Sequence, residues 1–222
     1  MPKGTRPAAE EAVEAPVPTA SATVTLHAEG DAALVLHNER LADPLDPITR
    51  ALQAYTAKRK KTEADHMEIG RLEFLGGLYL SGPAELKEGH LIAAPGAVPC
   101  LPAWNVLRCL QDGARRHKRG VDVPRGIHPL VEYATLNYEG PDDPQELWES
   151  GEFALRKTVG VQRARTVRTR PMFQPWSIDL PIEVDPVVFD LDTLAVLWAE
   201  AGRYSGLGEM RPVYGRFVGT IR

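Results

Sequence analysis

Cysteine is scarce in this chain: two occur among 222 residues, Cys100 and Cys109, and neither has partners at metal-ligand spacing. This scarcity excludes a cysteine-based zinc site and fits a reducing cytosol. No apolar run is long enough to span a bilayer, and the N-terminal stretch lacks the apolar segment of a signal peptide. We therefore expect a cytoplasmic protein with no membrane partner.

Signatures of catalysis are missing as well. There is no GxSxG sequence and no pair of carboxylates at a recognisable spacing, and no GK[ST] follows the GLG sequence near the C-terminus, so it is no P-loop. His37, His66 and His117 lie nearest to polar clusters. His117 stands beside arginines and could act as an acid or base on a ribose hydroxyl, although a lone surface histidine is more often a solvated side chain. Asp65 and His66 could be joined by Glu68 or Glu73 as metal ligands, but this spacing matches no zinc or magnesium site. We expect no catalytic residue, no metal and no cofactor.

The net charge of -4 argues against a uniformly basic nucleic-acid coat. Positive charge is instead gathered into three clusters, while acidic residues concentrate elsewhere. The clusters are Lys58, Arg59, Lys60 and Lys61; Arg115, Arg116, His117, Lys118 and Arg119; and Arg163, Arg165, Arg168 and Arg170. Such clustering on an acidic body is typical of a track for a polyanion. The alternative is that each cluster is a solvated helix end or loop.

Residues 1–20 are rich in Ala, Pro and Glu without periodicity, which predicts a disordered tail, and residues 21–222 are expected to form a single domain. Apolar residues between positions 24 and 36 predict two paired strands that turn at Glu29-Gly30-Asp31. A helix is predicted over residues 47–61, and Thr62 is expected to cap another that follows it.

Pro102 stands at a plausible first position of a further helix. Arg108, Asp112, Arg115 and Arg119 recur along one face of this helix, where a row of arginines can follow a phosphate backbone. The same pattern also fits a solvated face on which Asp112 forms an internal pair worth only about 0.3 kcal/mol.

The C-terminal part of the chain combines a helix, a glycine-rich loop and a closing strand. Asp190 can cap the helix, and Gly202 is expected to end it. Glycines in the loop would let a partner backbone approach closely, and its arginines would supply planar donor forks for phosphate. The alternative is a tight structural connection with solvated arginines. The loop residues concerned are Arg203, Gly206, Gly208, Arg211, Gly215 and Arg216.

Strands are predicted in between. The two-residue spacing of Arg163 and Arg165, and of Arg168 and Arg170, places each pair on one face of a strand. Alternation from Trp176 to Val184 predicts another strand with its apolar side chains inward. The order of elements predicts an α+β fold with a ferredoxin-like core of the RNA-recognition type and helical insertions.

Two motifs resemble the RAMP superfamily, the backbone subunits of CRISPR effector complexes. VPCLPAWNVLRCLQDGARR resembles the proline-led start of the helix that faces the guide RNA in those proteins, and AGRYSGLGEMRPVYGRF resembles their glycine-rich loop. KTVGVQRARTVRTRPMFQPWSIDLPIEV resembles the segment that leads to their penultimate strand. Trp104 and Asn105 depart from the small and lysine residues of that helix start, and the chain lacks a recognisable acidic cutting loop, which argues against RNA cleavage.

Residues 21–222 also look like a family of small, mostly uncharacterised phage proteins, through the runs LHNERLADPLDP, KRKKTEADH, RLEFLGGLY and GLGEMRPVYGRF. This resemblance implies a phage-encoded protein in the cytoplasm of the host cell.

Together, the arginine clusters and the resemblance predict a non-catalytic protein that binds single-stranded nucleic acid and oligomerises along it, closing into rings or running on as filaments. RNA is favoured over single-stranded DNA by the resemblance alone. The alternatives are a metal-independent ribonuclease of the same superfamily and a phage structural or assembly protein. The candidate binding residues are Lys58, Arg59, Lys60, Lys61, Trp104, Asn105, Arg108, Arg115, Arg116, Arg119, Arg163, Arg165, Arg168, Arg170, Arg203, Gly206, Gly208 and Arg211.

Overall fold

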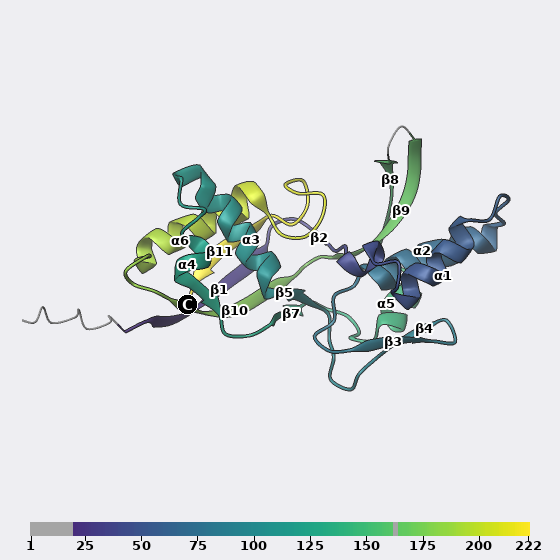
Figure 1. The fold of residues 1–222 in the computed structure, drawn as a ribbon, viewed down its shortest axis with the longest axis horizontal. Coiled ribbons are helices and arrows are strands. Elements are labelled where there is room, and N and C mark those ends of the chain that lie inside the picture. The colour runs from purple at the N-terminus through teal and green to yellow at the C-terminus, as the bar shows by residue number, and fades with distance from the viewer. Residues whose placement is uncertain (1–19, 162–163) are drawn as a thin grey trace, which may run out of the picture.

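The computed structural model describes residues 20–161 and 164–222. It is a mixed α+β fold with antiparallel sheets, as the sequence predicts. Figure 1 shows an elongated molecule with two lobes, one built around the strands β1 and β10 and the other around the helices α1 and α2. The predicted tail, except for residue 20, lies outside the described residues.

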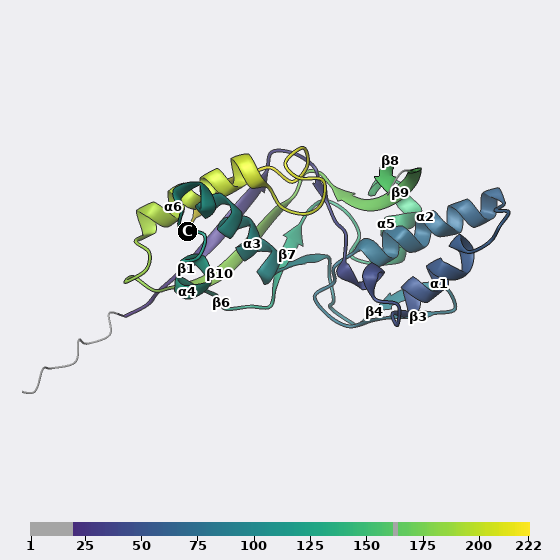
Figure 2. The same ribbon diagram turned by 45° about the horizontal axis from the view of Figure 1, so that its top comes forward.

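The first lobe is organised on an antiparallel sheet with the strand order β11-β1-β10-β7-β5, and β6 also pairs with β10. Two helices and a π-helical turn lie together on one face of this sheet (Figure 2). The strands are β1 (Ala22–Gly30), β5 (Cys100–Pro102), β6 (Ile127–Pro129), β7 (Tyr133–Asn137), β10 (Ser177–Val184) and β11 (Phe217–Ile221). The helices are α3 (Ala103–Ala114) and α6 (Leu191–Glu200), with the π-turn η3 (Ala201–Ser205). The short η2 (Arg115–His117) and α4 (Val123–Gly126) follow α3.

The second lobe comes from two insertions, one between β1 and β5 and the other between β7 and β10. The first insertion contains β2 (Leu34–Val35), η1 (Glu39–Ala42), α1 (Pro47–Thr56), α2 (Glu63–Gly77) and the hairpin of β3 (Ala84–Lys87) and β4 (His90–Ala93). The second contains α5 (Pro144–Ser150) and the hairpin of β8 (Ala154–Val161) and β9 (Ala164–Phe173). Because β2 pairs with β9 and α2 packs on β9, the two insertions form one unit. The β8–β9 hairpin projects from this lobe (Figure 1).

Local signals explain most helix starts. The side chains of Asp46, Asp143 and Asp190 accept hydrogen bonds from backbone N–H groups of the first turn in α1, α5 and α6. Thr62 and Asp65 form a reciprocal capping box at the start of α2, as predicted.

The core follows the alternation that the sequence shows. Ile178, Leu180, Ile182 and Val184 on β10 are buried, while Asp179 between them is exposed. The same apolar cluster extends through α3, α6 and α2, so both lobes contribute to it. Within the described ranges, no helix is both long and apolar enough to cross a membrane.

The strand pair predicted around Gly30 is wrong. β1 lies between β10 and β11, whereas β2 pairs with β9 in another sheet. The backbone N–H groups of Asp31 and Ala32 donate to the carbonyl of Arg216 instead of closing a hairpin. Gly30 is needed for another reason: a Cβ there would lie 2.4 Å from the indole Nε1 of Trp176.

The prediction that Gly202 ends the last helix is also wrong. The helix continues through it as η3, and Gly206, with φ of +74°, follows the last turn. Gly202 is buried, and the position requires glycine because a Cβ there would lie 2.3 Å from the carbonyl oxygen of Phe217. The helix predicted over residues 47–61 ends at Thr56, so the lysine-rich segment is a connection between α1 and α2.

Candidate nucleic-acid interface

Helix α3 presents the most concentrated set of predicted binding residues. Its buried face includes Val106 and Leu110, which pack in the core. On the opposite side, Trp104 is 52% exposed, and Arg108 and Arg115 are exposed as well. Helical spacing therefore places one large aromatic ring and two guanidinium groups on the outer side of one element.

Three arginines surround Asp112 on this helix. Arg108 Nε lies 3.5 Å from Asp112 Oδ1, Arg115 Nη1 lies 2.5 Å from the same oxygen, and Arg211 Nη1 lies 3.6 Å from Oδ2. We call these four residues the arginine cluster. One carboxylate neutralises one of three positive charges, which leaves an excess of two. Exposed ion pairs contribute only about 0–1 kcal/mol, so a phosphate can compete for the guanidinium groups.

The C-terminal loop brings Arg211 to α3. Backbone hydrogen bonds fix this loop to β2 and to the residue just before β2. Glu209 N donates to Val35 O at 2.7 Å, and Gly215 N donates to Ala33 O at 2.8 Å. Arg211 Nη1 also donates to Gly206 O at 3.3 Å. The helix after Pro102 and the glycine-rich loop, which the sequence presents as two separate motifs, thus meet at the arginine cluster.

The glycines of this loop have reasons within the chain itself. Gly208 has φ of +74°, and a Cβ there would lie 2.3 Å from Val35 O. At Gly215 a Cβ would lie 1.7 Å from Leu207 O, and at Gly206 it would lie 3.0 Å from Gly215 O. The loop therefore requires glycine for its own packing, and close approach of a partner is not needed to explain Gly206 or Gly208.

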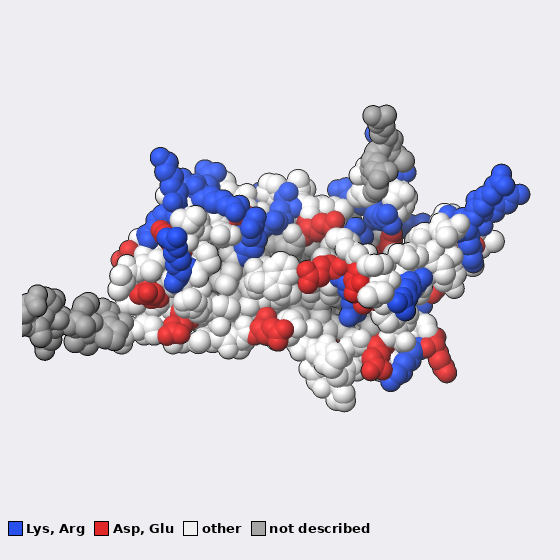
Figure 3. All heavy atoms as spheres, in the orientation of Figure 1, with Lys and Arg blue, Asp and Glu red and all other residues white. Residues whose placement is uncertain are grey.

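A second basic group lies at the C-terminal ends of α3 and α6. The Arg116 guanidinium lies 4.2 Å from the ring centroid of Tyr204, and the Arg203 guanidinium lies 5.3 Å from it. His117 Nε2 is 2.8 Å from Glu200 Oε2, so a carboxylate holds the histidine considered as an acid or base. Figure 3 shows Lys and Arg side chains gathered over this end of the first lobe. Sequence reasoning did not single out Tyr204, which follows Arg203 directly.

Arg119 is engaged in packing. Its guanidinium stacks 4.4 Å from the ring centroid of Phe189 and donates to Val188 O at 2.6 Å. Its Nε lies 3.0 Å from Asp122 Oδ2. With its donors committed in this way, Arg119 joins α3 to the segment before α6, and the predicted row of arginines is broken at this position.

Two arginines of β9 hold the second lobe together. Arg168 pairs with Glu73, which is only 2% exposed and also accepts from Thr169 N at 2.8 Å. Arg170 is itself buried, and its Nε lies 2.6 Å from Glu209 Oε2 in the C-terminal loop. Arg168 and Arg170 therefore fix β9 to α2 and to the loop, although both are among the residues predicted to bind nucleic acid.

Arg165 is exposed on the projecting part of the hairpin, and Arg163 lies outside the described residues.

Arg168 and Arg170 border a cavity of about 510 Å³ that also contains His37. Desolvation by its surroundings, followed by the nearby charge of Arg170, lowers the pKa of His37. Glu73 pairs with Arg168 and Glu209 pairs with Arg170, so the positive charges at the edge of this cavity are neutralised within the chain.

The lysine-rich connection lies at the far tip of the second lobe, beyond α1 and α2 (Figure 1). Lys58 Nζ lies 2.5 Å from Asp65 Oδ1, and this hydrogen bond is the largest cause that lowers the pKa of Asp65 to about 2. Lys61 Nζ donates to Lys58 O at 2.8 Å. Arg59 and Lys60 are exposed. The segment thus supplies two solvated charges that are separate from the arginine cluster.

The cysteines and the possible metal ligands were also considered as reactive groups. Both thiols are buried, and burial raises the pKa of Cys100 and of Cys109 to about 12, so neither is a nucleophile at neutral pH. Among the described residues, no three His, Cys, Asp or Glu side chains lie together so that they could hold a metal ion.

Comparison with known proteins adds no family to this picture: no model of a protein family matches the chain, and no curated protein sequence matches it.

Proposed function

We propose that the chain binds single-stranded nucleic acid without cutting it, and that the arginine cluster on α3 contacts the phosphate backbone. One observation carries the proposal. Arg108, Arg115 and Arg211, which come from segments about a hundred residues apart, converge on one exposed surface with an excess of positive charge. Planar guanidinium groups around a weakly held carboxylate suit phosphate oxygens.

Trp104 favours a single strand over a duplex. It precedes Arg108 by one helical turn, and its ring is 52% exposed. Proteins that bind single strands combine a positive track with aromatic rings on which bases stack, each stacked base contributing about 1–3 kcal/mol. A duplex offers stacked bases only at its ends. RNA is preferred over single-stranded DNA in this proposal on the basis of the sequence resemblance.

The topology of the first lobe supports a ferredoxin-like, RAMP-like core. Taking β1, β7, β10 and β11 as first to fourth, their order in the sheet is fourth, first, third, second, and every neighbouring pair is antiparallel. α3 lies between the first and second of these strands, and α6 between the third and fourth. This is the arrangement of a split β-α-β fold. Assembly of several phage-encoded copies along one strand is part of the same proposal.

Binding of labelled single-stranded RNA tests the function. The combined variant Arg108→Ala, Arg115→Ala and Arg211→Ala removes the cluster's positive charges while Asp112 remains. A matched variant, Arg50→Ala, Lys87→Ala and Arg222→Ala, removes the same charge from exposed positions on other elements. The proposal expects the first variant to lose most of the affinity and the second to retain it.

Equal affinity of the two variants would show that only net charge matters and would contradict the proposed site. Absence of wild-type binding to RNA and to single-stranded DNA at low salt would contradict the function itself.

A further inference from the structure

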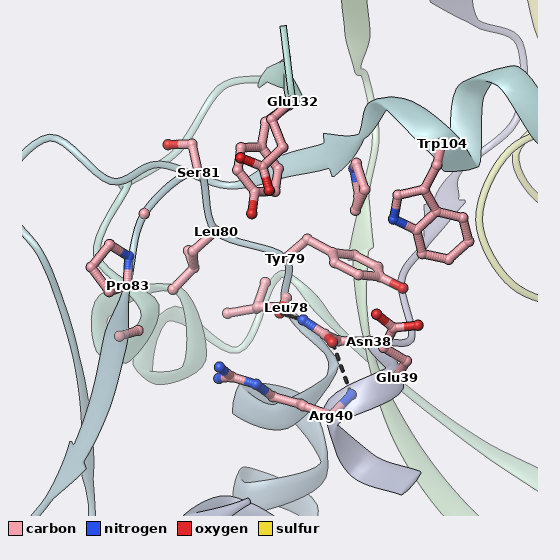
Figure 4. Close-up of a pocket in the computed structure, with 14 residues that line it drawn as sticks. Asn38, Glu39, Arg40, Leu78, Tyr79, Leu80, Ser81, Pro83, Trp104 and Glu132 are labelled. Carbon is pink, nitrogen blue, oxygen red and sulfur yellow. Dashed lines mark hydrogen bonds between the residues drawn. The ribbon is translucent and has the colours of Figure 1, made fainter. Parts of the chain in front are cut away.

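A cavity of about 610 Å³ opens beside Trp104 at the start of α3. Four parts of the chain form it: the start of η1, the segment after α2, the junction of β5 and α3, and the turn into β7. Figure 4 shows Trp104, Tyr79 and Glu39 toward one side of the cavity and Glu132 and Ser81 toward another. Its volume lies within the range of ligand-binding pockets, about 300–1,000 Å³.

The lining pairs aromatic rings with carboxylates. Trp104, Tyr79 and Tyr133 contribute rings, and Glu39 and Glu132 contribute acidic groups. Two carboxylates repel a phosphate group, so an occupant has to present a flat surface to the rings and N–H donors to the oxygens. These are the properties of a nucleobase, because single-stranded bases are recognised by stacking on aromatic side chains and by hydrogen bonds along their edges.

The two carboxylates differ in what they already contact. Hydrogen bonding to Glu132 raises the pKa of the Tyr133 phenol, so Glu132 has a neighbour inside the cavity. Over residues 20–161 and 164–222, no ion pair and no hydrogen bond involves the Glu39 carboxylate. Glu39 is exposed, and Figure 4 shows its carboxylate beside the Tyr79 hydroxyl, on the same side of the cavity as Trp104. Glu39 is therefore the free acceptor beside the stacking surface.

We propose that this cavity binds a guanine base of the bound strand, stacked on Trp104, with its N1–H and N2–H groups donating to Glu39. Guanine is the one standard base that presents two adjacent donors on its pairing edge, and these match the two oxygens of a carboxylate. Adenine, cytosine and uracil each present a donor next to an acceptor there, and the acceptor would face the negative charge. The inference rests on the proposed function, because Trp104 and Arg108 lie one turn apart and would contact the same strand.

A lysine or arginine side chain from a protein partner is the competing occupant, since cations also bind to aromatic rings and carboxylates. The cavity favours the base. Arg40 also lines it, but its guanidinium lies 3.5 Å from Asp46, so that pair is neutral and the rings decide between the two occupants. Three aromatic rings line the cavity and offer more than one stacking surface to a planar base.

Four labelled strands test the proposal: an oligouridylate, and the same strand with one guanosine, one inosine or one adenosine. Wild-type protein should bind the guanosine strand at least about fivefold more tightly than the others, because one bidentate contact discriminates by that amount or more. Inosine lacks the N2 amine and should lose most of the gain. Glu39→Gln should abolish the preference but keep the affinity for oligouridylate. Glu132→Gln removes the same charge from the same cavity and should keep the preference.

Equal binding of all four strands would overturn the guanine site and leave the proposed function standing. Loss of the preference in both glutamine variants would show an effect of charge alone and would also overturn it. Binding of no strand would overturn the proposed function, and the guanine site with it. A lysine-containing peptide that binds wild-type protein but not Glu39→Gln, in the absence of a guanosine preference, would assign the cavity to a basic protein partner.

Discussion

The buried carboxylate of Glu73 provides a sharp test of how the second lobe is held together. Glu73 is 2% exposed, its Oε2 accepts from Thr169 N at 2.8 Å, and its other oxygen accepts from Arg168. Glu73→Ala leaves a buried backbone N–H without its acceptor, which costs about 1–3 kcal/mol. It also leaves Arg168 unpaired, although that side chain is 31% exposed and can regain water. We expect a total loss of about 2–4 kcal/mol in the free energy of unfolding.

Urea unfolding followed by circular dichroism measures this loss. Glu73→Gln should lose less than Glu73→Ala, because its amide oxygen can still accept from Thr169. Glu85→Ala is the matched control: Glu85 pairs with Lys87 at 2.8 Å, but the two side chains are 70% and 64% exposed. It should leave the unfolding midpoint unchanged. If Glu73→Ala were as stable as the wild type, the contact between α2 and β9 would not support the lobe and the reasoning would fail.

Three further predictions concern the α2 cap, the C-terminal loop and catalysis. The pKa of Asp65 is lowered to about 2, so its contribution to stability should be fully present above the ordinary pKa near 3.8 and vanish as the pH falls to 2. The stability difference between wild type and Asp65→Asn, measured by urea unfolding at several pH values, should therefore shrink over that interval, and a constant difference would contradict it. Gly208→Val should unfold the protein or lower its melting temperature markedly, because a Cβ meets Val35 O at 2.3 Å and positive φ costs about 1–2 kcal/mol more. Arg211→Ala should keep the melting temperature and weaken binding, and the opposite pattern would refute both assignments. Bound RNA should stay intact in the presence of a metal chelator, and cleavage that His117→Ala abolishes would show a metal-independent ribonuclease instead.

Features encoded by neighbouring residues were predictable from the sequence. Asp190 caps α6 through a residue three positions away, and the alternation along β10 reflects its two faces directly. Arg108 and Arg211 were both predicted to bind nucleic acid, but their convergence on Asp112 was not predicted. Its geometry depends on hydrogen bonds that fix the loop on Ala33 and Val35.

What failed depended on contacts between distant segments. Gly202 reads as a helix terminator, but its role is set by Phe217, which a strand brings against it. Arg168 and Arg170 appear in the sequence as free positive charges, yet their partners Glu73 and Glu209 come from α2 and the C-terminal loop. Ion pairs between distant segments cannot be predicted from a local sequence pattern. Clusters of arginine in a sequence therefore overstate the positive charge that is available to a ligand.

The salt dependence of single-strand binding tests the central claim most directly. Each phosphate neutralised on a single strand contributes about 0.7 to the slope of log affinity against log salt concentration. Wild-type protein should show a clear negative slope, and the variant without Arg108, Arg115 and Arg211 should show a slope smaller by about 2, corresponding to three lost phosphate contacts. The matched variant without Arg50, Lys87 and Arg222 should keep the wild-type slope. A flat wild-type response, or an equal slope in wild type and cluster variant, would contradict the assignment of the phosphate track to α3.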